Sequence, residues 1–146
     1  MIRVSPFVVS AKLLTVLSRL ANSWCDLKTN GQQASVPLET RAPASYVLVF
    51  DNTNGLTTGV ALANASGTPA KVSVIIRDDT GTQIGTDTIS FSGHGHTSFL
   101  LPSKYAFAGN KRGMVEFVVP QGGQISVVGL RAKADGTLTT MPVLTK

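Results

Sequence analysis

The chain has 146 residues, so a single domain of ordinary size is expected. Hydrophobic residues make up 42% of it and charged residues 14%, a balance that excludes a largely disordered chain. Its 14 glycines follow no period, which excludes a collagen-like protein. The single cysteine excludes an internal disulfide and a zinc site built from cysteines.

The formal net charge of +5 raises nucleic acid or a membrane surface as a partner, so its distribution matters. Residues 1–45 carry five basic and two acidic side chains (+3), and the remaining residues carry eight and six (+2). Lys111-Arg112 is the one adjacent basic pair, and no series of aromatic residues accompanies it as single-strand binding would require. We therefore expect no nucleic-acid partner.

Residues 2–24 are apolar but are interrupted by Arg3, Lys12 and Arg19. A membrane-spanning helix needs about 20 mainly apolar residues, and charges at its centre are costly, so we expect no transmembrane segment here. A signal peptide fits loosely, because Lys12 lies within the apolar stretch and Ala21-Asn22-Ser23 is a weak cleavage site.

Within this stretch, Ala11–Leu20 predicts a short amphipathic helix. Leu13, Leu14, Leu17 and Leu20 form one stripe, with the basic residues off it. Residues 26–45 contain Asn30-Gly31, Pro37 and Pro43, which indicates a linker with one short strand near Ala34–Leu38. We expect residues 1–33 to be an appendage, either a short helix or disordered, and residues 34–146 to be the folded domain.

From Tyr46 onward, short β-branched runs alternate with clusters of Gly, Asn and Asp, a pattern typical of an all-β sandwich. Asp78-Asp79-Thr80-Gly81 predicts a tight hairpin, and the phase of the next run indicates a bulge near Gly85–Asp87. Pro102–Phe107 predicts a single helical turn. The predicted strands are Tyr46–Phe50, Thr58–Ala63, Lys71–Arg77, Thr82–Phe91, His96–Leu101, Gly113–Val119, Gln124–Ala132 and Thr137–Val143.

Alternation along these strands also predicts which side chains face the core. Gln124–Ala132 is more uniformly apolar, so we expect a central position for it. The fold class is therefore an antiparallel sandwich of seven or eight strands, immunoglobulin-like or fibronectin-like. The residues expected inward are Val60, Leu62, Val72, Val74, Ile76, Phe99, Leu101, Val115, Phe117 and Val119.

Several strings occur in order over about residues 36–146: VPLETR, SYVLVFDNTNGLTTGVALAN, IRDDTGTQIGT, GHTSFLLP, NKRGMVEF and VVGLR followed by TTMPV. Together they resemble an uncharacterised β-sandwich module found in secreted and surface proteins of soil bacteria. The resemblance implies a sandwich fold and an extracytoplasmic or secreted setting, and it points to no particular activity. Residues 1–33 do not match, so an edge strand could be left exposed and favour a homo-oligomer.

Gly93-His94-Gly95-His96 holds both histidines of the chain. Two imidazoles two residues apart can face one way on a strand and bind a metal ion together. A third ligand would have to be a carboxylate, with Asp87 preferred over Asp51, Asp79 or Glu116. Such a zinc or calcium site could activate water for hydrolysis of an ester or a lactone. The favoured alternative is a surface turn with no cofactor, because GHTSF in the resemblance matches His96 alone.

Other candidate chemistry is weaker. Asp51–Gly55 resembles a calcium loop faintly, but it lacks the spacing of an EF-hand. Ser98 and Ser92 flank the histidines, so a Ser–His pair is conceivable, although no Gly-x-Ser-x-Gly turn supports it. Cys25, beside Trp24, is expected to be a half-buried structural thiol.

These observations favour a non-catalytic accessory or interaction module that binds other protein domains or cell-surface components. The alternative is a small metal-assisted hydrolase centred on His94 and His96, with Ser98 as a further catalytic candidate.

Overall fold

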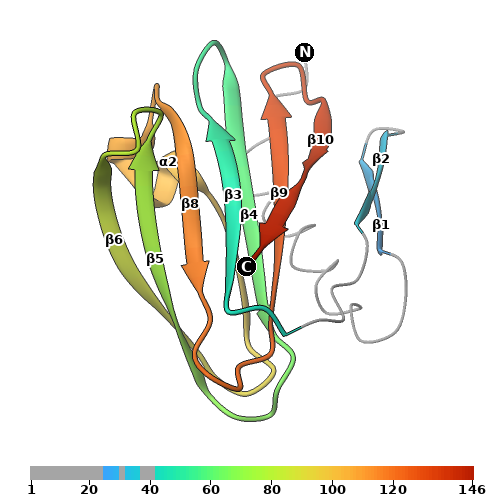
Figure 1. The fold of residues 1–146 in the computed structure, drawn as a ribbon. Helices are drawn as coiled ribbons and strands as arrows, with labels where there is room; N and C mark the ends of the chain where they lie inside the picture. Colours follow the sequence, from blue (N-terminus) through green and yellow to red (C-terminus); the bar gives the residue numbers. More distant parts are fainter. Residues whose placement is uncertain (1–24, 30–31, 37–41) are drawn as a thin grey trace.

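The computed structural model describes residues 25–29, 32–36 and 42–146 (Figure 1). Two antiparallel sheets account for most of it, a five-stranded sheet in the order β11-β3-β8-β5-β6 and a four-stranded sheet in the order β10-β9-β4-β7. The predicted β-sandwich is therefore confirmed, with nine strands in the two sheets where seven or eight were expected. The strands are β3 Ser45–Asp51, β4 Leu56–Asn64, β5 Ala70–Asp78, β6 Gln83–Phe91, β7 His96–Leu100, β8 Arg112–Val118, β9 Ile125–Lys133, β10 Leu138–Met141 and β11 Val143–Thr145.

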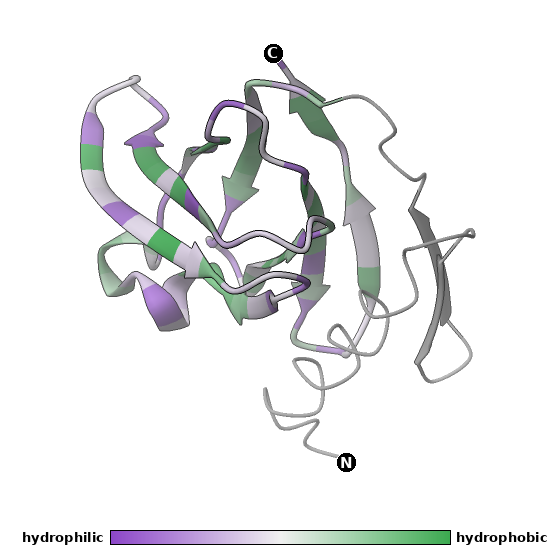
Figure 2. Ribbon diagram, turned by 90° about the horizontal axis from the view of Figure 1, so that it is seen from below, coloured by the Kyte–Doolittle hydropathy of each residue, from purple (hydrophilic) through white to green (hydrophobic). Residues whose placement is uncertain are grey.

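The core lies between the sheets and follows the predicted alternation. Figure 2 shows hydrophobic and hydrophilic residues alternating along the strands. Tyr46 links the two layers, because its hydroxyl donates a hydrogen bond to the carbonyl of Ile125 on the opposite sheet. The expected inward residues Val60, Leu62, Val72, Val74, Ile76, Leu101, Val115, Phe117 and Val119 are all buried in the core, and Phe99 packs against it.

The hairpin between β5 and β6 confirms both the predicted turn and the predicted bulge. Gly81 has a φ of 87°, and the Asp78 carboxylate accepts hydrogen bonds from the backbone N–H groups of Thr80 and Thr82. The register shifts between Ile76 and Arg77 of β5, which pair with Gly85 and Gln83, so Ile84 is the extra residue. The bulge thus begins one residue before the predicted range.

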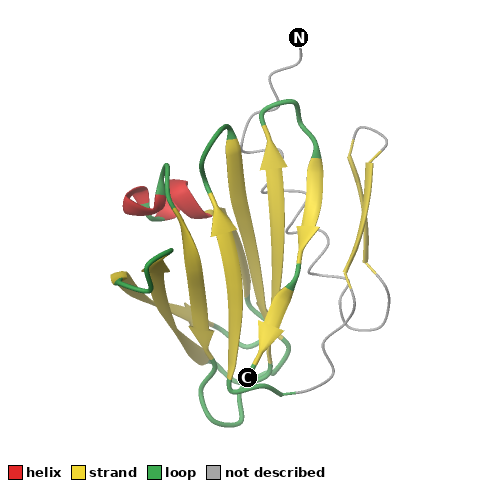
Figure 3. Cartoon of the chain, turned by 45° about the horizontal axis from the view of Figure 1, so that its top comes forward, coloured by secondary structure: helices red, strands yellow, loops and turns green. Residues whose placement is uncertain are grey.

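The connection between β7 and β8 contains the described helical segments, shown in Figure 3. Helix α2 spans Leu101–Lys104, and the 3₁₀ turn η1 spans Ala106–Ala108. Leu101 was expected at the end of a strand and instead begins the helix, because Pro102 lacks the N–H that a strand would donate. Its inward orientation is nevertheless as predicted.

The predicted last strand, Thr137–Val143, is wrong in its extent. Met141 is the last residue paired with β9, and Val143 is the first paired with β3 of the other sheet. Pro142 lies between them and has no N–H for either sheet. The chain therefore changes sheets at Pro142 and joins the two layers along one side of the sandwich.

Ahead of the sandwich, the described residues include a separate hairpin of β1 Cys25–Thr29 and β2 Gln32–Val36. The predicted boundary between residues 33 and 34 therefore falls inside β2, and residues 25–29 of the predicted appendage are strand, where a helix or disorder was expected. Asn30-Gly31 is typical of a linker but is also the strongest short signal for a hairpin. The predicted helix Ala11–Leu20 lies outside the described residues. No helix in the described part of the chain is long and apolar enough to cross a membrane.

Candidate functional site

The loop that carries the histidines joins β6 to β7 and is held by backbone contacts. The N–H of His94 donates to the carbonyl of Ser66 at 2.8 Å, and the φ of His94 is 57°. A Cβ on Gly93 would lie 2.0 Å from the carbonyl oxygen of Gly67, so only glycine fits there. The side-chain amide of Asn64 donates to the carbonyls of Thr68 and Ser92. Packing between the loop after β4 and the loop before β7 thus explains most of the Gly93-His94-Gly95-His96 motif.

Both imidazoles are exposed, and the structure does not bring a third ligand to them. Nowhere in residues 42–146 or the described hairpin do three His, Cys, Asp or Glu residues form a group suited to a metal ion. Asp87 points inward from the middle of β6 and has other partners, and Asp79 lies in the turn at the far end of that strand. The proposed set of His94, His96 and Asp87 is therefore not assembled.

Ser98 follows His96 by two residues on β7, so both belong to the outward row of the four-stranded sheet. Ser98 pairs across the sheet with Ala61, a buried residue of β4. Its position in the middle of β7, an edge strand of the four-stranded sheet, differs from the exposed strand-to-helix turn that serine nucleophiles occupy in hydrolases.

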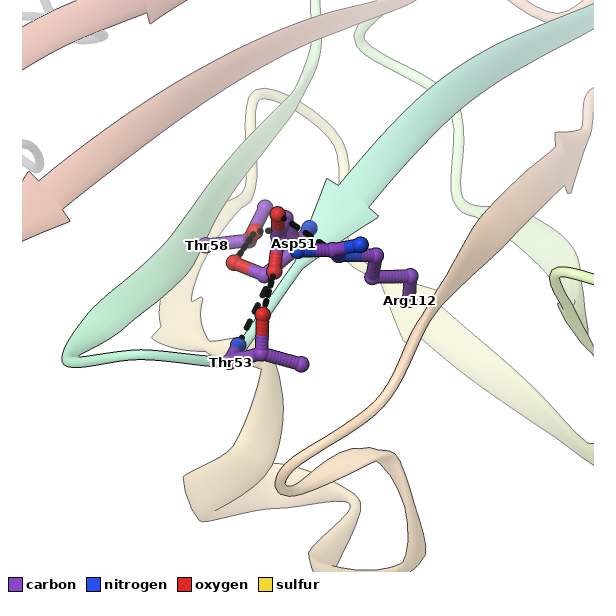
Figure 4. A network of polar contacts seen from close by, with 4 residues as sticks. All are labelled: Asp51, Thr53, Thr58 and Arg112. Atoms are coloured by element: carbon purple, nitrogen blue, oxygen red, sulfur yellow. Dashed lines mark hydrogen bonds and ion pairs between the residues drawn. The ribbon is translucent and has the colours of Figure 1, made fainter.

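The loop after β3, the faint calcium motif, is satisfied by its own hydrogen bonds (Figure 4). One oxygen of Asp51 accepts from the N–H and the hydroxyl of Thr53, at 2.9 and 2.6 Å, and the other pairs with Nε of Arg112 at 3.0 Å. The hydrogen bond from Thr53 is the main reason that the pKa of Asp51 lies below its usual value. Buried Asn52 bonds to Thr58 and to the carbonyl of Ala108. This arrangement is an Asx turn that fixes the corner of the sandwich.

A polar cluster that the sequence did not reveal lies where β6 meets helix α2. The hydroxyl of Tyr105 donates to the carboxylate of Asp87 at 2.8 Å, and Nζ of Lys104 lies 3.4 Å from the same carboxylate. Lys104 also lies 5.4 Å from the ring centroids of Phe99 and Tyr105. The hydrogen bond from Tyr105 is the largest cause of the lowered pKa of Asp87, while burial is the largest cause of the raised pKa of Tyr105.

The position of Asp87 explains this cluster. It belongs to the inward row of β6, because it pairs with buried Val74 of β5. β6 is an edge strand, and an inward charge on an edge strand disfavours pairing with another chain. Phe107 covers the same strand, since a Cβ on Gly85 would lie 2.2 Å from its ring. The feature of the sequence that could have revealed this inward carboxylate is that Asp87 alternates in phase with the apolar residues Ile89 and Phe91.

The largest apolar side chains exposed on a sheet lie on the outer side of the five-stranded sheet. Val49 of β3 is 55% exposed, Met114 of β8 is 39% exposed and Leu144 of β11 is 61% exposed. Val49 and Met114 are cross-strand partners, and Leu144 pairs with Val47, two residues before Val49 on the same side of the sheet. We call Val49, Met114 and Leu144 the exposed face. Clustered apolar exposure of this kind is typical of interaction surfaces.

Charges around the exposed face are mainly basic. The outward side chains of Arg77, Arg112 and Lys146 stand against two carboxylates, Asp51 and Glu116. Glu116 is 18% exposed and accepts a hydrogen bond from Ser45 while it pairs with Arg77 and Lys146. The basic partners Arg112 and Lys146 are 55% and 68% exposed, so the charge that reaches solvent beside the face is positive.

Comparisons with known proteins establish fold alone. No family model matches the chain, and no curated protein shows a significant match. The crystal structure of Thermotoga maritima 1070 is similar, with a TM-score of 0.50, 10% identity, and coverage of 73% of this chain and 93% of that one. FlgD from P. aeruginosa is less similar, with a TM-score of 0.31, 17% identity, and coverage of 73% of this chain and 77% of that one. The chain thus shares a sandwich-like fold with the Thermotoga protein.

Proposed function

We propose that this chain is a non-catalytic interaction module of an exported bacterial protein, and that it binds another protein domain through the exposed face. The observation that carries the proposal is the apolar cluster of Val49, Met114 and Leu144. The extracytoplasmic setting rests on the resemblance of residues 36–146 to modules of secreted and surface proteins.

The charges beside the exposed face define the chemistry of the partner. Exposed basic side chains around an apolar centre favour a surface that is apolar and acidic, because complementary charge speeds encounter and disfavours wrong partners. The partner is therefore a protein surface with apolar side chains flanked by Asp or Glu. The carboxylates are weaker candidates for binding a partner protein, since Asp51, Asp87 and Glu116 already have basic partners within the module.

Two designed amphipathic peptides with identical apolar residues, one acidic and one basic, provide the test. We expect the acidic peptide to bind more tightly, and its affinity to fall as salt is added. Val49→Asp with Leu144→Asp removes binding. The matched control, Thr86→Asp with Thr88→Asp, places the same charge on exposed β6 positions of the same sheet and retains most of it. Equal binding of both peptides, or no effect of the first pair, would contradict the proposal.

A further inference from the structure

The two edges of the five-stranded sheet differ in how well they are protected. β6 forms one edge and β11 forms the other. β6 carries the inward carboxylate of Asp87, which disfavours the addition of a further strand. β11, Val143–Thr145, carries no charged side chain and lies beside the exposed face, to which it contributes Leu144. A strand added at β11 would therefore meet open backbone groups and exposed apolar side chains together.

The backbone groups of β11 face two directions in alternation. Lys146 and Ser45 of β3 exchange two backbone hydrogen bonds, at 3.0 and 3.3 Å. Because bonded and non-bonded pairs alternate along an antiparallel ladder, Leu144 also bonds to β3, whereas Val143 and Thr145 direct their N–H and C=O groups away from it. In the described part of the chain, no strand pairs with β11 on that side. Val143 and Thr145 thus each present a donor and an acceptor at the open edge.

We propose that the partner binds as an extended segment that pairs antiparallel with β11 and adds a strand to the five-stranded sheet. This inference rests on the proposed function and gives it a binding mode. Hydrogen bonds to Val143 and Thr145 supply affinity that does not depend on the partner's side chains, and every second side chain of the added strand lies next to the exposed face.

The outward side chains of this region define the sequence of the added strand. Its residue opposite Leu144 lies about 5 Å away, in a non-bonded pair where side chains approach closely, so an apolar residue fits there. The residue two positions earlier lies opposite Lys146, which is 68% exposed, so an acidic residue fits there.

A second apolar residue fits two positions after the first. The pairing of β11 with β3 ends at Val143 and Leu48, so no paired residue occupies the flank of Val49, the next outward residue of β3. Val49 is 55% exposed, and an apolar side chain on the added strand can extend over this flank. The favoured segment therefore has an acidic residue followed by apolar residues two and four positions later.

Backbone methylation of one peptide tests the proposal on the unaltered, full-length chain. The parent peptide is Thr-rich, with Asp, Ile and Val at this spacing. Methylation of the backbone nitrogens of the two Thr residues between them removes the N–H groups that face β11, and we expect at least about tenfold weaker binding by fluorescence anisotropy. Methylation of Ile and Val, whose N–H groups face away from β11, is the matched control and should change the affinity less than about twofold.

A substitution in β11 tests the same hydrogen bonds from the side of the protein. Thr145→Pro removes one N–H at the open edge, a position where a strand tolerates proline, and leaves Leu144 paired with β3. We expect the parent peptide to bind about fivefold more weakly. Thr145→Val keeps the N–H and should bind as the original chain does. Circular dichroism checks that both variants keep the fold, and the methylated peptides decide the matter if Thr145→Pro does not.

The outcomes separate the binding mode from the proposed function. Equal losses for the two methylated peptides, while Val49→Asp with Leu144→Asp still removes binding of the parent, would overturn strand addition and leave the exposed face as the site. Tighter binding of a peptide with the same composition and helical spacing would also overturn it, in favour of a docked helix. Failure of the parent to bind, or binding that the Asp pair leaves intact, would contradict both.

Discussion

Replacing Phe117 with Ala tests the packing of the sandwich most severely. Phe117 lies in the middle of β8, between Tyr46 of β3 and Val74 of β5, and all three side chains are almost completely buried. Truncation removes the whole phenyl ring from a site that cannot collapse, because the strands on both sides are fixed by backbone hydrogen bonds. We expect a loss of about 3–5 kcal/mol in the free energy of unfolding.

Urea unfolding followed by circular dichroism measures this loss. With a slope of about 2 kcal/mol per molar for a domain of this size, a loss of 4 kcal/mol lowers the midpoint by about 2 M. Val49→Ala is the control, since Val49 is on the opposite side of the same sheet and should cost less than about 0.5 kcal/mol. Equal losses in the two variants would refute the assigned register, because a shift of one residue exchanges the two faces.

Three further outcomes are expected. The folded-state pKa of Asp87 is lowered, so the carboxylate stabilises the fold fully above about pH 4, and this stabilisation is lost as the pH falls through the lowered value. Asp87→Asn should therefore flatten the acid side of a curve of unfolding free energy against pH, and an unchanged slope would contradict this. Gly113→Ala should cost about 1–3 kcal/mol, because its Cβ would lie 2.0 Å from the carbonyl oxygen of Arg77, whereas Gly67→Ala, with its nearest contact at 3.4 Å, should cost little in the same unfolding assay. His94→Ala with His96→Ala should change stability by no more than about 0.5 kcal/mol in thermal unfolding, and loss of a bound metal ion in this variant would instead support metal-assisted hydrolysis.

Strand positions followed from local chemistry, so most of the sandwich could be predicted. Val72, Val74 and Ile76 alternate with polar residues, and Asp78 to Gly81 form a turn whose hydrogen bonds are local. Pro142 was harder, because strands on both sides of it have the same pattern. Only the pairing partners, Gly129 on one side and Leu48 on the other, reveal that the chain changes sheets there.

The uniform apolarity of β9 reflects its central position, which the sequence suggested, and the burial of its outer side, which the sequence did not suggest. Its predicted central position is confirmed, since it lies between β10 and β4. Ile125 and Val127 face the core, but Val128 and Leu130 are buried on the outer side as well. A strand that is apolar on both faces predicts a layer on each of them.

The candidate sites depended on contacts distant in sequence and were therefore the least predictable. Asp87 could serve as a metal ligand by type, but its inward position on an edge strand directs it to Tyr105, 18 residues later. The exposed face could not be recognised either. Val49 and Met114 become neighbours through the pairing of β3 with β8, which no local pattern specifies.

Peptide titration of isotope-labelled protein, observed by NMR, tests the central claim most directly. If the module binds through the exposed face, the acidic amphipathic peptide should shift the backbone signals of β3, β8 and β11 around Val49, Met114 and Leu144. Signals from the outer side of the four-stranded sheet, at Ala61 and Val128, should stay in place. Shifts centred on the His94–His96 loop or the β6 edge, or an absence of saturable shifts, would contradict the account.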